Sequence, residues 1–249
     1  MKSLALDDIL NNPAIWRIGQ VPMSRKATIP TGSSLLDIAL PGHGWEIGAL
    51  TEILTNEQGI GELSLLIPAL RETTRSGRAV VLVAPPYVPL PMTLENRSAL
   101  LHRIVIINAE KQELLWATEQ AARSGAAGMV VAWESGSPRD WNYQALRRLH
   151  VAADNGGTAL LLYRRASAIN GASPAPTRLS LSADSGELLV QIAKRRGALI
   201  AETIRLNLFP PHWRARSACV VRETREASLE NSVAAVFSNQ QIQHLSASR

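Results

Sequence analysis

Asn56-Glu57-Gln58-Gly59-Ile60-Gly61-Glu62-Leu63 is the stretch that decides the fold class of this chain. It follows an apolar run at residues 49–54 and precedes a leucine-rich run, so it lies between a predicted strand and a predicted helix. Its spacing is that of the phosphate-binding loop G-x-x-x-x-G-K-[ST], in which backbone amides and a lysine hold phosphates and a hydroxyl binds Mg²⁺. In an alternative interpretation, Gly59 and Gly61 form only an ordinary strand-to-helix turn.

Three positions of this loop carry the wrong chemistry for phosphate. Asn56 replaces the first glycine, Glu62 replaces the lysine and Leu63 replaces the hydroxyl residue. A unit charge pair at ~4 Å near a protein surface is worth about 4 kcal/mol, so a carboxylate in place of an ammonium turns attraction for phosphate into comparable repulsion. Leucine offers no oxygen to Mg²⁺. We therefore expect an NTPase-like scaffold without catalytic activity, bound cofactor or metal ion.

Composition favours a globular protein of the cytoplasm. The 249 residues suit one α/β domain with extensions, and 46% hydrophobic residues allow a sizeable core. Cys219 is the single cysteine, which fits a reducing compartment, and no secretory signal or membrane span is recognisable. The net charge of +5 permits an acidic partner such as nucleic acid without requiring one. The six tryptophans are spread along the chain, as expected for packing rather than for base stacking.

Strands and helices alternate through the middle of the chain. The predicted strands are short apolar runs at residues 49–54, 80–83, 104–107, 129–133 and 158–163. The predicted helices lie at residues 33–40, 63–75, 111–124 and 141–154, with a kink or a displaced first turn at Pro68 in the second. This order implies a largely parallel central sheet flanked by helices. Residues 167–176 are expected to form a flexible loop, and alternating runs near residues 179–181, 188–192 and 204–208 predict an antiparallel C-terminal extension.

We divide the chain into three regions. Residues 1–31 are expected to form a short amphipathic helix around Leu4 to Leu10 and an extended linker from Pro22 to Thr31. Residues 32–209 form the predicted core domain. Residues 210–249 form a polar tail, which is expected to be loosely held or to bind a partner.

Several short segments carry a resemblance to known proteins through their order and spacing. They are Leu6-Asp7-Asp8-Ile9-Leu10, Ile15-Trp16-Arg17, Ile29-Pro30-Thr31-Gly32-Ser33-Ser34-Leu35-Leu36-Asp37, Leu40-Pro41-Gly42-His43-Gly44-Trp45, Gly48-Ala49-Leu50-Thr51-Glu52-Ile53-Leu54, Val83-Ala84-Pro85-Pro86, Thr118-Glu119-Gln120-Ala121-Ala122-Arg123-Ser124-Gly125 and Val131-Ala132-Trp133. The order of elements resembles the RecA-type ATPase core. The segments together, from residue 4 to residue 208, resemble the bacterial ImuA family, whose members are RecA-like and SulA-related and are encoded with a damage-inducible mutagenesis cassette.

The resemblance implies an accessory role in translesion DNA synthesis after DNA damage, under the SOS response, as an adaptor for a mutagenic polymerase complex. The implied partners are ImuB, an inactive polymerase-like protein of the Y family, an error-prone replicative-type polymerase and RecA. Single-stranded DNA and self-association are further candidates. Two alternatives stay open: a SulA-like division inhibitor that binds a tubulin-like GTPase, and a recombinase-type ATPase. The N-terminal segment and the long tail favour the ImuA-like role.

Two further positions depart from the RecA-type pattern. Ala132-Trp133 end a predicted strand where the RecA-type core holds an acidic residue, and Pro85-Pro86 follow the strand at residues 80–83 where the catalytic carboxylate would lie. Glu134 follows Trp133 and is expected to be a surface carboxylate at the start of a loop, with substitution for the missing acidic residue as the alternative. These absences and the altered loop argue together against ATP hydrolysis.

Basic residues near two loops are the candidates for DNA contact, with solvated surface charge as the alternative. In a RecA-type core the loops after the central strands face the DNA, and here these loops are residues 134–142 and 166–177. The resemblance places near them Arg139, Arg164, Arg165, Lys194, Arg195 and Arg196. The five histidines, by contrast, lack the spacing of metal ligands and are expected at the surface or in capping positions.

Overall fold

The computed structural model describes residues 26–89, 91, 94, 99–197 and 202–208. The predicted N-terminal helix and the predicted C-terminal tail therefore lie outside the described residues. Within the described part of the chain, no helix is long and apolar enough to cross a membrane.

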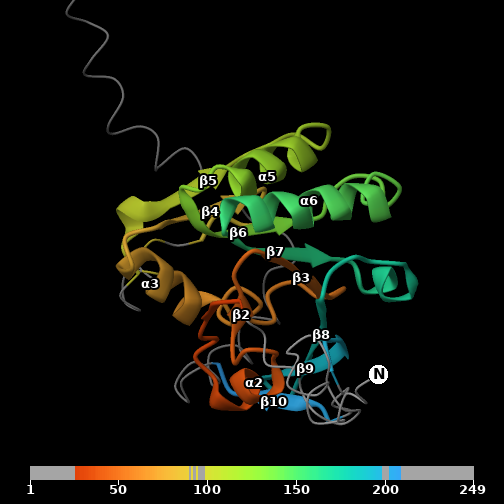
Figure 1. Ribbon diagram of the computed structural model, residues 1–249. Helices are drawn as coiled ribbons and strands as arrows, with labels where there is room; N and C mark the ends of the chain where they lie inside the picture. Colours follow the sequence, from red (N-terminus) through yellow and green to blue (C-terminus); the bar gives the residue numbers. More distant parts are fainter. Residues whose placement is uncertain (1–25, 90, 92–93, 95–98, 198–201, 209–249) are drawn as a thin grey trace, which may run out of the picture. The chain divides into compact units, whose positions relative to one another are not determined.

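The described residues form an eight-stranded sheet with the order β10-β9-β8-β3-β7-β6-β4-β5 (Figure 1). Its strands are β3 (Ala49–Leu54), β4 (Ala79–Val83), β5 (Ile104–Ile107), β6 (Ala127–Trp133), β7 (Ala159–Arg164), β8 (Thr177–Asp184), β9 (Glu187–Lys194) and β10 (Ile204–Leu206). Strands β3 to β8 pair in parallel, whereas β9 and β10 join by antiparallel pairing. The predicted α/β fold, with a largely parallel sheet and an antiparallel C-terminal extension, is confirmed.

Helices cover the two faces of this sheet. On one face α5 (Leu114–Arg123) and α6 (Tyr143–Gly156) pack over the strands, and on the other lie α2 (Ser34–Ala39) and α3 (Ile67–Arg75) (Figure 1). Adjacent strand residues alternate between the two cores: Val81 on β4 faces α5 and α6, whereas Val80 faces the side of α2 and α3. Successive residues of a strand point to opposite faces of the sheet, and helices cover both faces. Both sets of side chains are therefore apolar.

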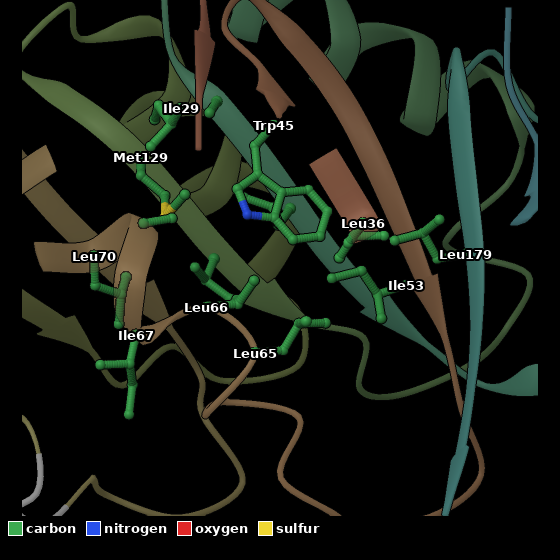
Figure 2. Close-up of a cluster of buried hydrophobic side chains, with 14 of the residues drawn as sticks. Ile29, Leu36, Trp45, Ile53, Leu65, Leu66, Ile67, Leu70, Met129 and Leu179 are labelled. Atoms are coloured by element: carbon green, nitrogen blue, oxygen red, sulfur yellow. The ribbon is translucent and has the colours of Figure 1, made fainter. Parts of the chain in front are cut away.

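The first turn of the second predicted helix is displaced, as Pro68 led us to expect. Residues 62–66 form turns, and the regular helix α3 begins at Ile67 with the proline in its first turn, where a missing N–H costs no hydrogen bond. Leu65 and Leu66 lie in the hydrophobic core together with Trp45 (Figure 2). The apolar side chains after the loop therefore anchor it to the core.

The predicted linker is described from Lys26 onward, where it is extended and packs against the rest of the domain. Thr28–Ile29 form β1, which pairs antiparallel with β2 (Trp45–Glu46), and Ile29 is buried. The Lys26 ammonium donates to the Gly48 carbonyl at 2.6 Å and pairs with the Asp154 carboxylate at 2.5 Å. Residues 26–29 are thus held against the edge where β3 begins.

Helices α5 and α6 approach each other closely at one glycine. A Cβ on Gly156, in the last turn of α6, would lie 2.0 Å from the carbonyl oxygen of Ala122 on α5. Gly157 follows as the C-cap, with a φ of 56° in the left-handed region and no atom within 4 Å of a Cβ. Gly156 is therefore required for the close approach of the two helices, and Gly157 for its left-handed backbone conformation.

Replacing Gly156 by alanine is expected to destabilise the protein by ~2 kcal/mol, because α5 and α6 must separate to admit the methyl group. The free energy of unfolding, measured in urea, tests this. Gly157→Ala is the matched control and is expected to cost ~1 kcal/mol, through backbone strain alone. A Gly156→Ala protein as stable as the wild type would contradict the close approach of the helices.

Candidate functional site

The loops that follow β3, β4, β6 and β7 line a cavity of ≈ 590 Å³. They lie at the carboxyl edge of the parallel strands, which is where open α/β sheets bind their ligands. The octet contributes Asn56, Glu57, Gln58 and Glu62 to the wall, and the loops after β6 and β7 contribute Glu134 and Arg165 among others. We call this space the cradle.

Glu62 turns its carboxylate back into its own loop. The Gly59 N–H, held at a φ of 75°, donates to Glu62 Oε1 at 3.1 Å. In a phosphate-binding loop such an amide donates to a phosphate oxygen. The Glu57 N–H is also used, since it donates to Thr55 Oγ1 at 3.0 Å. The chain thus supplies internal acceptors to amides that a phosphate would otherwise approach.

The late start of α3 removes a second feature of a phosphate site. A helix that opens directly after the loop points its free amides and the positive end of its dipole at the anion. Here the Leu65 N–H donates to the Gly61 carbonyl at 3.1 Å and the Leu66 N–H to the Leu63 carbonyl at 2.9 Å. The helix N-terminus is therefore displaced from the loop by several residues.

An aromatic pair supports the cradle from the sheet. The rings of Trp133 at the end of β6 and Tyr163 on β7 stack with centroids 5.3 Å apart. The Tyr163 hydroxyl donates to the Glu62 carbonyl at 2.6 Å, and burial raises the pKa of this phenol well above its usual value, so it stays a donor. The backbone of Glu62 is thereby fixed to the sheet.

A buried carboxylate next to the cradle joins three strands. Glu52 on β3 is fully buried and accepts hydrogen bonds from Arg164 Nη1 at 3.2 Å, Arg178 Nε at 2.7 Å and Ser173 Oγ at 2.9 Å. Glu52 and Arg178 were not among the site residues predicted from the sequence. The signal that could have found them is a charged residue within an otherwise apolar strand, which must be paired when it is buried.

Two expectations about charged residues are corrected by this network. Glu134, expected at the surface, has a side chain only 2% exposed and pairs with Arg164 Nε at 3.0 Å. Arg164, a candidate for DNA contact, is buried and donates its remaining nitrogen to the Trp141 carbonyl at 3.1 Å. The guanidinium is occupied by carboxylates and a carbonyl of its own chain, so it is not available to phosphate.

The loop after β7, expected to be flexible, is held by Arg178. The segment begins with a short 3₁₀ helix, η2 (Ala166–Asn170). Arg178 on β8 donates to the carbonyls of Ala168 at 2.6 Å, Ile169 at 3.1 Å and Gly171 at 3.2 Å. Asn56 Oδ1 accepts from the Ala166 N–H at 2.9 Å and so ties this segment to the octet. These hydrogen bonds hold the loop in one conformation, so the expectation of a flexible loop is corrected.

The other basic candidates lie in two places. Arg195 is buried and donates to the Ala39 carbonyl, and Arg196 pairs with Glu46 at 3.1 Å, so both contact the region of α2 and β2. Lys194 is exposed and donates to the Ser173 carbonyl at 2.8 Å. Arg165 and Arg139 are exposed on the loops after β7 and β6. Of the predicted set, Arg165 and Arg139 alone present exposed guanidinium groups on those two described loops.

The described residues contain no group of three or more His, Cys, Asp or Glu placed to hold a metal ion. His150 has a structural contact, because its Nδ1 accepts from the Leu50 N–H at 3.2 Å. Burial, with Lys26 nearby, lowers the pKa of His150, which favours the neutral form that can accept this bond.

Comparison with known proteins finds weak similarity to RecA proteins. No family model matches the chain. It is 27% identical over 128 residues to RecA of Thermus thermophilus, which covers 51% of this chain and 37% of that protein. It is 28% identical over 119 residues to RecA of Thermus aquaticus (47% and 35%) and 29% identical over 138 residues to RecA of Gloeothece citriformis (52% and 38%). The matches span less than two fifths of these relatives, and together with the sheet they support a RecA-like core.

Replacing Glu52 by glutamine is expected to destabilise the protein by ~3 kcal/mol, because two buried guanidinium groups lose their shared counter-charge. Urea unfolding measures the loss. The control is Asp184→Asn, which removes an exposed partner of Arg205 and is expected to cost at most ~1 kcal/mol. Equal stability of the Glu52→Gln and Asp184→Asn proteins would contradict a structural role for the network.

Proposed function

We propose that this chain is a non-catalytic RecA-like accessory protein of SOS-induced translesion DNA synthesis, which acts as an adaptor for a mutagenic polymerase complex. The RecA-like core supports the scaffold, and the resemblance to the ImuA family supports the pathway. The observation that carries the loss of catalysis is the hydrogen bond from the Gly59 N–H to the Glu62 carboxylate at 3.1 Å.

Three features of the cradle act against nucleotide binding. A triphosphate at the octet would have to displace the Glu62 carboxylate from Gly59 and would then meet the negative charges of Glu62 and Glu57, whereas the cations of the cavity lining, Lys111, Arg164 and Arg165, lie outside the octet. Leu63 supplies no oxygen to a magnesium ion. Because α3 starts at Ile67, the helix dipole offers little compensation at the loop.

An adaptor role suits a scaffold that has lost nucleotide binding but keeps its folded surfaces. Without a nucleotide cycle, the protein acts through the surfaces that it presents. The Glu52 network fixes the loops at the cradle edge in one arrangement, which suits a constant binding surface. The partners that we propose are ImuB, an error-prone replicative-type polymerase and RecA, in the cytoplasm. Direct contact with DNA has less support, because Arg164 and Arg195 are buried.

Titration of the full chain with ATP and Mg²⁺ in a calorimeter is expected to give no binding heat up to ~1 mM nucleotide, because Glu62 repels phosphate and Leu63 offers no oxygen to Mg²⁺. A RecA protein in the same buffer is the positive control. Micromolar affinity, or turnover of ATP, would overturn the non-catalytic role and favour the recombinase-type ATPase.

Affinity purification of the tagged full chain from cells that express the mutagenesis cassette is expected to retain ImuB and the error-prone polymerase. A Glu62→Gln chain is the control and is expected to retain both equally, because the loop is not a nucleotide switch. Retention of neither partner would contradict the adaptor role. Cell filamentation together with direct inhibition of a purified tubulin-like GTPase would favour the division-inhibitor alternative.

A further inference from the structure

A short strap fastens the beginning of the described chain to the core. It consists of residues 26–29, and its Lys26 ammonium donates to the Gly48 carbonyl and pairs with the Asp154 carboxylate of α6. These two partners lie close together, because a Cβ on Gly48 would lie 3.3 Å from Asp154 Oδ1 and 3.4 Å from Lys26 Nζ. The strap is therefore fastened where the last turn of α6 approaches the chain just before β3.

His150 belongs to the same place, one helical turn before Asp154 on α6. Its half-buried ring accepts a hydrogen bond at Nδ1 from the Leu50 N–H, at 3.2 Å. Leu50 is fully buried in β3, so its amide has no water to replace this acceptor. An imidazole nitrogen accepts a hydrogen bond only while it carries no proton. The start of β3 is thus held by a ring that must be unprotonated at Nδ1.

Charged groups from four segments act on His150. Lys26 of the strap and Arg196 after β9 disfavour a further positive charge, whereas Asp154 on α6 and Glu46 on β2 favour it. Arg196 and Glu46 also pair with each other at 3.1 Å. Burial of the ring is the largest influence and Lys26 the second, and together they lower the pKa of His150 below its ordinary value. The surroundings therefore favour the neutral ring.

A proton on Nδ1 would weaken two attachments in one step. The Leu50 N–H would lose its acceptor, and the imidazolium would repel the Lys26 ammonium and compete for the Asp154 carboxylate. The hydrogen bond from Lys26 lowers the pKa of Asp154, so this carboxylate stays ionised while His150 titrates. The change with pH thus belongs to His150 rather than to its acidic neighbour.

We propose that His150 is a pH-dependent latch for the strap, which holds residues 26–29 against the start of β3 while its ring is neutral and releases them when Nδ1 is protonated. In the open strap the ring is solvated and takes up a proton more readily, so falling pH favours opening. The latch is closed above about pH 6.5 and opens progressively below it. Release would detach the residues before Lys26 from this anchor point. The cradle lies at the opposite, carboxyl edge of the strands and keeps its geometry.

Hydrogen exchange of the full chain, followed by NMR at single amides from about pH 7.5 to about pH 5, tests the latch. The Ile47 N–H reports on the strap, because it donates to the Ala27 carbonyl at 2.9 Å. Its protection, relative to the exchange rate of an unfolded peptide at the same pH, is expected to fall at least ~3-fold over this range. The Val131 N–H on the central strand β6 is expected to keep its protection.

Three variants separate the latch from general effects of acid. His150→Gln carries a side chain that stays neutral, and the pH dependence of Ile47 protection is expected to disappear. His102→Gln replaces an exposed histidine of the 3₁₀ helix η1 (Leu101–Arg103) and is expected to behave as the wild type. Lys26→Met removes a cation that opposes the proton, so the midpoint of the His150 titration is expected to move to higher pH.

Titration of the histidine rings of the wild type by NMR decides the proposal even if a variant fails to fold, and the midpoint of His150 is expected to lie below that of His102. Equal midpoints would overturn the latch. So would pH-independent protection of the Ile47 N–H, or an equal loss of protection at Val131, which would show global unfolding instead of local release. Retention of the wild-type pH dependence in His150→Gln would overturn it as well, by assigning the change to another group.

Discussion

One fully buried carboxylate, that of Glu52, receives hydrogen bonds from two arginines of other strands at the carboxyl edge of the sheet. Through Arg164 it reaches the loop after β6, and through Arg178 it holds the segment after β7. The net stabilisation from a buried ion pair is often small, but removing one member leaves a charge without a partner. The network therefore acts mainly by selecting a single arrangement of the loops.

The same principle recurs in the cradle. Glu62 serves as the acceptor for a loop amide, and Glu52 and Glu134 serve as the counter-ions of Arg164. In a nucleotide-dependent protein, amides and cations at the carboxyl edge of the strands are satisfied by phosphate. Here the chain's own carboxylates satisfy them. Because these anions are side chains of the protein, they are present at all times, and the loops have no separate ligand-free arrangement. This agrees with the proposed adaptor role.

The strands of the eight-stranded sheet and the helices that cover it were predictable because each depends on a local pattern. Periodicity placed the strands, and Pro68 indicated the displaced start of α3. A charge within an apolar strand indicates that Glu52 and Arg178 each need a partner, but their pairing with each other was not predictable, because they are 126 positions apart and meet through the register of β3 and β8. Glu134 and Arg164 sit at strand ends, where charge usually marks the surface. Their burial depends on the loops that cover them, and such packing leaves no local pattern.

Reversing the changes in the octet would require more than restoring a lysine and a hydroxyl. The amides of a phosphate site come from a helix that opens at the loop, whereas α3 opens at Ile67. Leu65 and Leu66 are buried in the core in the present turns, so winding residues 62–66 into that helix would require both side chains to repack. A return to phosphate binding would thus require a change in the apolar packing behind the loop as well as in the charge within it.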